Sequence, residues 1–194
     1  MKNYLRWLVK PYVTGSIIFV IIIGAIYTYA IYKLNDTRLR ELLLTQTINI
    51  ARNIDPRVVK TFSATEEDYE NHFFTSYLNR LRILRSLIPR CKYLYLMGRD
   101  NNKNIFFYLD TQEDTEETPP SQPGEIYEDA SEELINCFDT AQPFVEGPLQ
   151  DEWGIWVSGL VPIVDREENK VVAVLGIDIE ATDWEKLIWY KTYP

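Results

Sequence analysis

The sequence is poor in the residues from which metal and redox centres are built. It contains one histidine, His72, and two cysteines, Cys91 and Cys137, which lie far apart and outside any CxxC spacing. Neither a zinc site nor a dithiol motif is therefore predicted. The cysteines are compatible with one disulfide outside the cytoplasm, but we favour two separate, mostly buried thiols. His72 lies near the expected start of a helix, which favours a surface or capping role.

Catalytic motifs are absent as well. The sequence has no phosphate-cradling glycine loop, no nucleophile–base pair and no cluster of metal ligands. We therefore expect no enzymatic activity from this chain, no metal site and no cofactor.

Positive charge is scarce outside the N-terminus. The chain carries 20 Lys and Arg against 29 Asp and Glu, a formal net charge of −9. The first 32 residues carry Lys2, Arg6 and Lys10 and no acid, so the remainder carries −12. Such an acidic remainder does not neutralise phosphates, and we expect no nucleic-acid partner. It suits cationic ligands or divalent metals, although solubility alone explains most acidic surfaces.

Charge is missing altogether between Pro11 and Tyr32, a run of 22 uncharged residues. About 20 apolar residues span the bilayer core as a helix. The apolar run is longer than that of a signal peptide, and its tyrosines suit the membrane–water interface. We predict a cytoplasmic tail at 1–10, a transmembrane helix at 11–33 and an extracytoplasmic domain at 34–190. The basic tail places the N-terminus in the cytoplasm, so that the chain crosses the inner membrane once.

The segment after the apolar run has helical periodicity. Apolar residues recur at spacings of three and four between Leu34 and Phe62, and Asp55-Pro56 predicts a kink or a new helix start. This long helix continues from the membrane span. Its apolar stripe is wide enough to pack on the domain's own sheet and on a second copy, so a homodimer through this helix is expected.

The rest of the domain combines helices with antiparallel strands. We predict a helix start at Thr65, helices at 73–88 and 132–138, and a hairpin formed by 92–98 and 104–110. Between them, 111–124 (TQEDTEETPPSQPG) is an exposed loop in which Glu113, Asp114, Glu116 and Glu117 are candidate divalent-cation ligands without EF-hand spacing. A solvated loop is the simpler interpretation.

A second hairpin organises the domain. Residues 155–164 and 171–179 are rich in β-branched residues, and 165–170 are polar and turn-forming. The second strand is almost continuously apolar until Asp178. A single acid at the end of a buried strand indicates a carboxylate that the fold delivers to a particular place. Alternation puts Val172, Val174 and Gly176 on its face, with Trp156 and Ser158 opposite on the neighbouring strand.

These elements, in this order, resemble a single Cache-type (PAS-like) extracytoplasmic sensor domain. The resemblance covers about residues 34–188 and rests on the strings 93–98 (YLYLMG), 123–127 (PGEIY), 146–148 (EGP), 151–158 (DEWGIWVS), 161–163 (VPI), 171–178 (VVAVLGID) and 183–184 (DW). It implies an α+β fold in which the long helix packs on a PAS-like antiparallel sheet. Such domains are the inputs of membrane-bound histidine kinases, diguanylate cyclases and chemoreceptors, which usually have a second transmembrane helix and a cytoplasmic output domain.

The resemblance also implies a ligand site on the sheet face opposite the long helix. Asp178 matches an acid that often binds the ligand's amine in amino-acid-binding relatives. The candidate ligand-binding residues are Tyr95, Phe107, Asp110, Tyr127, Trp153, Trp156, Ser158 and Asp178. The alternative is that these aromatics fill a small core and Asp178 bonds to backbone. The chain lacks an evident arginine–tryptophan pair for a carboxylate, which argues against specificity for amino acids.

Three functions are compatible with the sequence. The first is a membrane-anchored signal-input domain that binds a small extracytoplasmic solute and acts through the N-terminal helix on a cytoplasmic output. The second is a ligand-free interaction or dimerisation module. The third is a divalent-cation sensor that uses the acidic loop.

Overall fold

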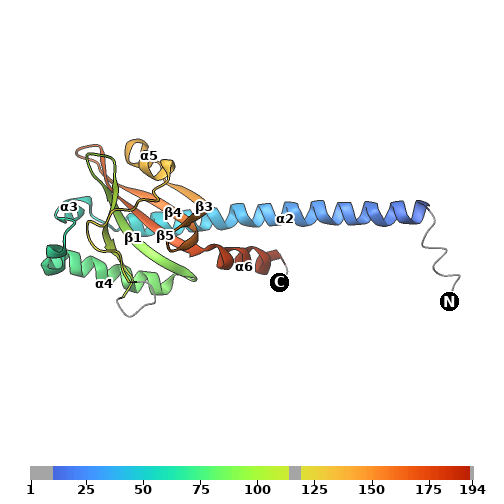
Figure 1. Ribbon diagram of the computed structural model, residues 1–194, viewed down its shortest axis with the longest axis horizontal. Helices are drawn as coiled ribbons and strands as arrows, with labels where there is room; N and C mark the ends of the chain where they lie inside the picture. Colours follow the sequence, from blue (N-terminus) through green and yellow to red (C-terminus); the bar gives the residue numbers. More distant parts are fainter. Residues whose placement is uncertain (1–10, 114–118, 193–194) are drawn as a thin grey trace. The chain divides into compact units, whose positions relative to one another are not determined.

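The computed structural model describes residues 11–113 and 119–192, which form two compact units (Figure 1). One unit comprises the described parts of 1–39 and 187–194, and the other comprises 40–186. The helices and strands are, in chain order, α2 (Pro11–Ala51), α3 (Pro56–Val59), the 3₁₀ helix η1 (Glu66–Glu70), α4 (His72–Leu87), β1 (Cys91–Arg99), β2 (Ile105–Asp110), α5 (Glu132–Thr140), β3 (Phe144–Asp151), β4 (Gly154–Asp165), β5 (Lys170–Glu180) and α6 (Ala181–Thr192).

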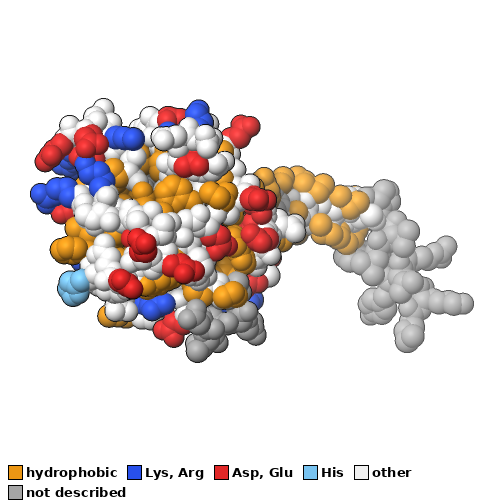
Figure 2. Space-filling model, turned by 60° about the vertical axis from the view of Figure 1, so that its left-hand side comes forward, with side chains coloured by type: hydrophobic (Ala, Val, Ile, Leu, Met, Phe, Trp, Pro, Cys, Tyr) orange, Lys and Arg blue, Asp and Glu red, His pale blue; other side chains and the backbone are white. Residues whose placement is uncertain are grey.

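The smaller unit is built from the first part of α2 and the end of α6. Its isoleucines and tyrosines between Tyr12 and Tyr29 are largely exposed, and the helix surface is apolar (Figure 2). By length and composition α2 is the one described helix able to cross a membrane. Within this unit the Asn35 side-chain amide donates to the carbonyl of Ile188 at 3.5 Å, and the rings of Tyr32 and Trp189 lie 5.8 Å apart. The expected helix at 11–33 is present, and its membrane insertion stays a prediction.

The larger unit is organised by a five-stranded antiparallel sheet with the order β2-β1-β5-β4-β3. The two predicted hairpins, β1–β2 and β4–β5, meet through β1 and β5, which makes β5 the central strand. A central strand is covered on both faces, and this explains why 171–179 is almost continuously apolar. The α+β fold predicted from the sequence, with a long N-terminal helix and an antiparallel sheet, is confirmed.

One face of the sheet packs against α2. The close approach requires glycine at position 159, because a Cβ there would lie 2.8 Å from the Leu43 side chain and 2.8 Å from Oγ1 of Thr47. Leu94, Leu96 and Ile177 are fully buried on this side of the sheet. The contact therefore joins β4 directly to the helix.

The opposite face is covered by α5 and by the segment that follows β2. Tyr93, Tyr95 and Met97 from β1 form a buried cluster here with Trp156 of β4 and Phe138 of α5. The rings of Tyr93 and Trp156 lie 4.8 Å apart in an edge-to-face arrangement. Side chains of β1 therefore alternate, with these tyrosines and Met97 on one face and Leu94 and Leu96 on the other.

Several local predictions need correction. The edge strand β3 (Phe144–Asp151) and the helix α6 were not predicted. Thr65 precedes η1 but its hydroxyl makes no cap hydrogen bond, because it pairs with the Ser63 hydroxyl at 2.8 Å. The long helix ends at Ala51, and Pro56 starts α3 with Asp55 as its cap, which confirms a new helix start.

A register shift between β4 and β5 also changes which valine lies on the same sheet face as Asp178. Pairing passes from Ile163–Ala173 to Val164–Val171, which leaves Val172 outside the alternation. Val171 rather than Val172 therefore joins the cluster that contains Val174. Both cysteines are free thiols, as favoured from the sequence.

Candidate ligand-binding cavity

A small cavity lies on the α5-covered face of the sheet, beneath the chain that follows β2 and the β3–β4 turn. Its volume is about 30 Å³. A water molecule occupies roughly 10–15 Å³ by this measure, so the cavity holds about two. Its walls are Tyr93, Tyr95, Met97, Phe107, Asp110, Gln112, Pro119, Ser121, Tyr127, Asp151, Trp153 and Asp178.

Asp178 is delivered to the floor of the cavity by β5. Its neighbours across the sheet are Tyr93 on β1 and Ser158 on β4. The Tyr95 hydroxyl donates to Oδ1 of Asp178 at 3.0 Å, and Ser158 makes a second side-chain hydrogen bond to the same carboxyl group. Burial disfavours the charged form and raises the pKa of Asp178 to about 7, against the lowering effect of the two hydrogen bonds. Asp178 therefore exchanges its proton near neutral pH.

Asp110 forms a second carboxyl group of the wall, at the end of β2. Its Oδ1 accepts from the backbone N–H of Gln112 at 3.2 Å, and its Oδ2 accepts from the N–H of Ser121 at 3.1 Å. These bonds position Gln112 and Ser121, which both line the cavity. Burial raises the pKa of Asp110, and the backbone donors oppose that effect.

Asp151 is the third carboxyl group, at the end of β3. Its Oδ1 accepts from Nε1 of Trp156 at 2.8 Å and from the backbone N–H groups of Trp153 and Gly154 at 2.9 and 3.0 Å. Its Oδ2 accepts from the Tyr127 hydroxyl at 3.2 Å. Asp151 thus holds the β3–β4 turn in the conformation that presents Trp153 to the cavity.

Three aromatic rings form the outer wall. The rings of Tyr127 and Trp153 are stacked at 5.9 Å, and Phe107 lies 5.9 Å from Tyr127 and 6.1 Å from Trp153. Tyr95 meets Phe107 edge-on at 5.7 Å. Electron-rich ring faces close to carboxylates attract cations.

The polar groups of the wall are short of hydrogen-bond donors. No Lys or Arg occurs among the described lining residues. Gln112 is 3% exposed, and its Oε1 is a buried acceptor with no donor in the described structure. The nearby Arg82 and Arg85 donate to the carbonyl oxygens of Gln112 and Thr111. The arrangement suits a ligand that brings N–H donors and positive charge.

The structure brings most of the predicted site residues together. Six of the eight line the cavity, namely Tyr95, Phe107, Asp110, Tyr127, Trp153 and Asp178. The other two lie on the same sheet face without lining the cavity. Trp156 is hydrogen-bonded to Asp151, and Ser158 is hydrogen-bonded to Asp178. Ligand contact by these eight residues stays a prediction. Gly176 was expected to leave room in the site. The Tyr95 ring occupies the space that a side chain at this position would need.

Other wall residues were not predicted. Tyr93 was detectable, because alternation places it on the same face as Tyr95. Gln112 lies in the polar loop without periodicity, and Asp151 opens one of the strings that carry the family resemblance but was not singled out as a site residue.

The described residues contain no group of three or more His, Cys, Asp or Glu arranged to hold a metal ion. Asp114, Glu116 and Glu117 of the predicted acidic loop lie outside the described residues. Glu113 precedes that part of the chain.

No family model and no curated protein sequence matches the chain. Solved structures do. The sensory domain of the Campylobacter jejuni chemoreceptor Tlp3 (CcmL) is similar with a TM-score of 0.50 and 18% identity, over 92% of this chain and 68% of that one. The Tlp3 ligand-binding domain in complex with L-norvaline is similar with a TM-score of 0.51 and 16% identity, over 93% of this chain and 66% of that one. The chain therefore has the fold of a chemoreceptor sensory domain, in agreement with its resemblance to Cache-type sensors.

Proposed function

We propose that this chain is a membrane-anchored sensor domain whose ligand is a small molecule with a protonated amine. One observation carries the proposal: three carboxyl groups and Gln112, whose side-chain Oε1 has no donor in the described structure, line an aromatic-walled cavity that has no basic side chain among its described lining residues. An ammonium group supplies three donors and one positive charge. It therefore supplies the hydrogen-bond donors and the positive charge that the described cavity wall lacks.

The same wall disfavours a ligand carboxylate. A buried anion needs a charged or hydrogen-bonding partner, and without one its desolvation costs several kcal/mol. The Tlp3 domain that shares this fold was crystallised with L-norvaline, which supports a small-molecule ligand for the fold. Here we expect the amine to dominate recognition, and an amino acid to bind more weakly than the corresponding amine.

Ligand binding requires the cavity to grow. About 30 Å³ is too little for an amine of several carbon atoms, so wall residues must move outward on binding. A ligand shifts a conformational equilibrium only through different affinities for its two states. In this proposal the amine stabilises the wider arrangement.

Movement of the sheet has a direct route to α2. The proposed widening displaces β4 and β5, and β4 packs on α2 through the contact of Gly159 with Leu43 and Thr47. The N-terminal part of α2 is the predicted membrane span. We propose that the helix, paired with a second copy in a homodimer, transmits the displacement to a cytoplasmic output.

A set of three compounds tests the ligand class. L-Norvaline, butylamine and pentanoate share an alkyl chain. L-Norvaline carries both an ammonium and a carboxylate group, butylamine carries only the ammonium group, and pentanoate carries only the carboxylate group. The unfolding temperature of the full chain in micelles should rise most with butylamine and should not change with pentanoate. Ligand linkage predicts about 2.7 kcal/mol of stabilisation at a hundredfold excess over the dissociation constant.

Two variants locate the effect. Asp178→Asn should abolish the shift with butylamine, whereas Glu133→Gln, which removes an exposed acid of α5 outside the cavity wall, should retain it. Stabilisation by pentanoate alone, or a butylamine effect that survives Asp178→Asn, would contradict the proposal.

A second candidate function rests on the size of the cavity. Aromatic contacts already fill most of the space, as expected of a ligand-free interaction or dimerisation module. In that case no compound in a broad screen of amines, amino acids, carboxylates and divalent cations shifts the unfolding temperature of the folded chain.

A further inference from the structure

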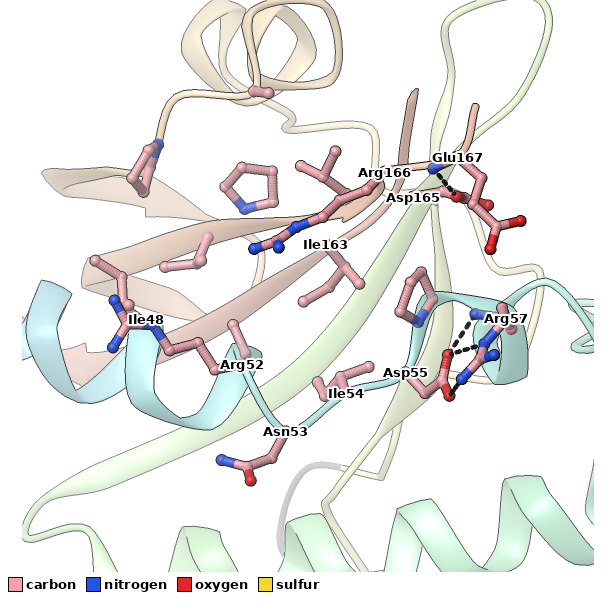
Figure 3. A pocket seen from close by; sticks show the side chains of 17 residues that line it. Ile48, Arg52, Asn53, Ile54, Asp55, Arg57, Ile163, Asp165, Arg166 and Glu167 are labelled. Atoms are coloured by element: carbon pink, nitrogen blue, oxygen red, sulfur yellow. Dashed lines mark hydrogen bonds and ion pairs between the residues drawn. The ribbon is translucent and has the colours of Figure 1, made fainter. Parts of the chain in front are cut away.

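A second and larger depression lies on the other side of the sheet, between the end of α2, α3 and the end of β4 (Figure 3). Its volume is about 700 Å³, and it is open to solvent. Ala51, Ile54, Val161 and Ile163 are buried lining residues and supply an apolar floor. The walls are stiffened by Pro56, Pro143 and Pro162. We call this depression the α2–β4 groove.

The charged residues of the groove divide into paired and unpaired groups. Asp55 and Arg57 form an ion pair at 2.8 Å, and Asp165 pairs with Lys60 at 2.6 Å. Arg52 and Arg166 are exposed, and neither guanidinium has a hydrogen bond or an ion pair with any residue that the structure describes. In a chain with nine more acids than bases, two arginines in one groove without a carboxylate partner are unexpected.

The two arginines reach over the apolar floor from different elements, Arg52 from just after α2 and Arg166 from the turn after β4. In Figure 3 the side chains of Arg52 and Arg166 extend toward the α2 end, over Ile48 and Ile163, while Asp55, Asp165 and Glu167 lie toward α3. The groove therefore combines a positive end with an apolar floor. Guanidinium groups bind carboxylates through paired, charge-assisted hydrogen bonds.

The dipole of α2 weakly disfavours an anion near the C-terminal end of the helix. A helix C-terminus carries about half a negative charge, and that effect fades within the last turn. The arginines supply two full positive charges. Their positive charge therefore exceeds the partial negative charge of the helix end.

We propose that the α2–β4 groove binds a small carboxylate with an apolar body, the carboxylate between Arg52 and Arg166 and the apolar part on Ile54 and Ile163. The occupant would contact the last turn of α2 and the β4 strand at once. This site has the opposite charge preference to the cavity around Asp178, and it does not depend on the function proposed for that cavity.

Benzoate, 3-phenylpropionate and octanoate test the proposal, each beside its neutral amide. Binding to the full chain in lipid nanodiscs is measured by saturation-transfer difference NMR, with empty nanodiscs as the background. At least one acid should bind and its amide should not. Loss of one charge-assisted pair should weaken binding about tenfold, so Arg52→Gln and Arg166→Gln each raise Kd about tenfold and the double variant abolishes the signal.

Arg80→Gln is the matched control, because Arg80 is an exposed arginine of α4 that does not line the groove. Binding should be unchanged in this variant. Circular dichroism establishes that the double variant is folded. Absence of binding by all three acids, equal binding of acid and amide, or undiminished binding by the folded double variant would each overturn the proposal.

Discussion

Replacing Asp178 by asparagine removes a charge from the interior while keeping nearly the same shape. The pKa of Asp178 is raised from an ordinary value of 3.8 to about 7, chiefly by burial. A folded-state pKa above the unfolded one means that the folded state holds the proton more tightly. Stability is therefore greatest below the unfolded pKa, falls as the pH rises from about 4 to 7, and levels off above that range.

The size of this effect follows from the same two pKa values. Each unit of difference corresponds to about 1.4 kcal/mol, so the full penalty at pH 8 is about 4 kcal/mol as an order of magnitude. Asparagine carries no such penalty and can still accept from the Tyr95 hydroxyl. We expect Asp178→Asn to be more stable than the wild type at pH 8 by about 2–4 kcal/mol, and the two proteins to converge near pH 4.

Urea unfolding of the full chain in micelles, followed by tryptophan fluorescence at pH values from 4.5 to 8, measures this difference. Asp110 and Glu146 also have raised pKa values because of burial, and they add pH dependence of the same sign to both proteins. The difference between the two curves isolates Asp178. A wild type that gains stability relative to Asp178→Asn as the pH rises through 5–8 would refute the reasoning.

Three further predictions concern other parts of the chain. Butylamine should bind more tightly as the pH rises from 6 to 8, because ionised Asp178 pairs better with the ammonium group; calorimetry showing pH-independent affinity would contradict this. Gly159→Ala should lower the free energy of unfolding by about 1–3 kcal/mol through overpacking against α2, whereas Gly24→Ala, whose Cβ meets nothing within 4 Å, should not. Cys91 and Cys137 should alkylate slowly at pH 8 in the native chain, since burial raises their pKa values to about 12 and 11; mass spectrometry showing rapid labelling or a disulfide would exclude this.

Local sequence patterns predicted most of the secondary structure. The helix over His72–Leu87, the strands of both hairpins and the helix start at Pro56 all follow from periodicity, capping and proline. The edge strand β3 was missed because glycine and proline interrupt it, and its burial is only partial. α6 was missed because its pattern, with Trp184 and Ile188 buried, is short and flanked by charge.

The candidate cavity was only partly predictable. The lone acid at the end of an apolar strand indicated Asp178, and the resemblance to Cache-type sensors supplied Tyr95 as a candidate. Asp151 and Gln112 reach the same space from loops and strand ends, and their position depends on how distant segments pack. The unpaired side-chain Oε1 of Gln112 is a property of the packed structure.

By itself the sequence determined the apolar span of α2, the acidic charge of the remainder, the α+β class and the delivery of a lone carboxyl group by a buried strand. These follow from composition and from periods of 3.6 and 2, which each segment carries locally. Only the tertiary structure decided that β5 is central, that three carboxyl groups share one small cavity and that Arg52 and Arg166 line one groove with an apolar floor. Burial and pairing are sums over contacts between segments far apart in the chain, so no local pattern records them.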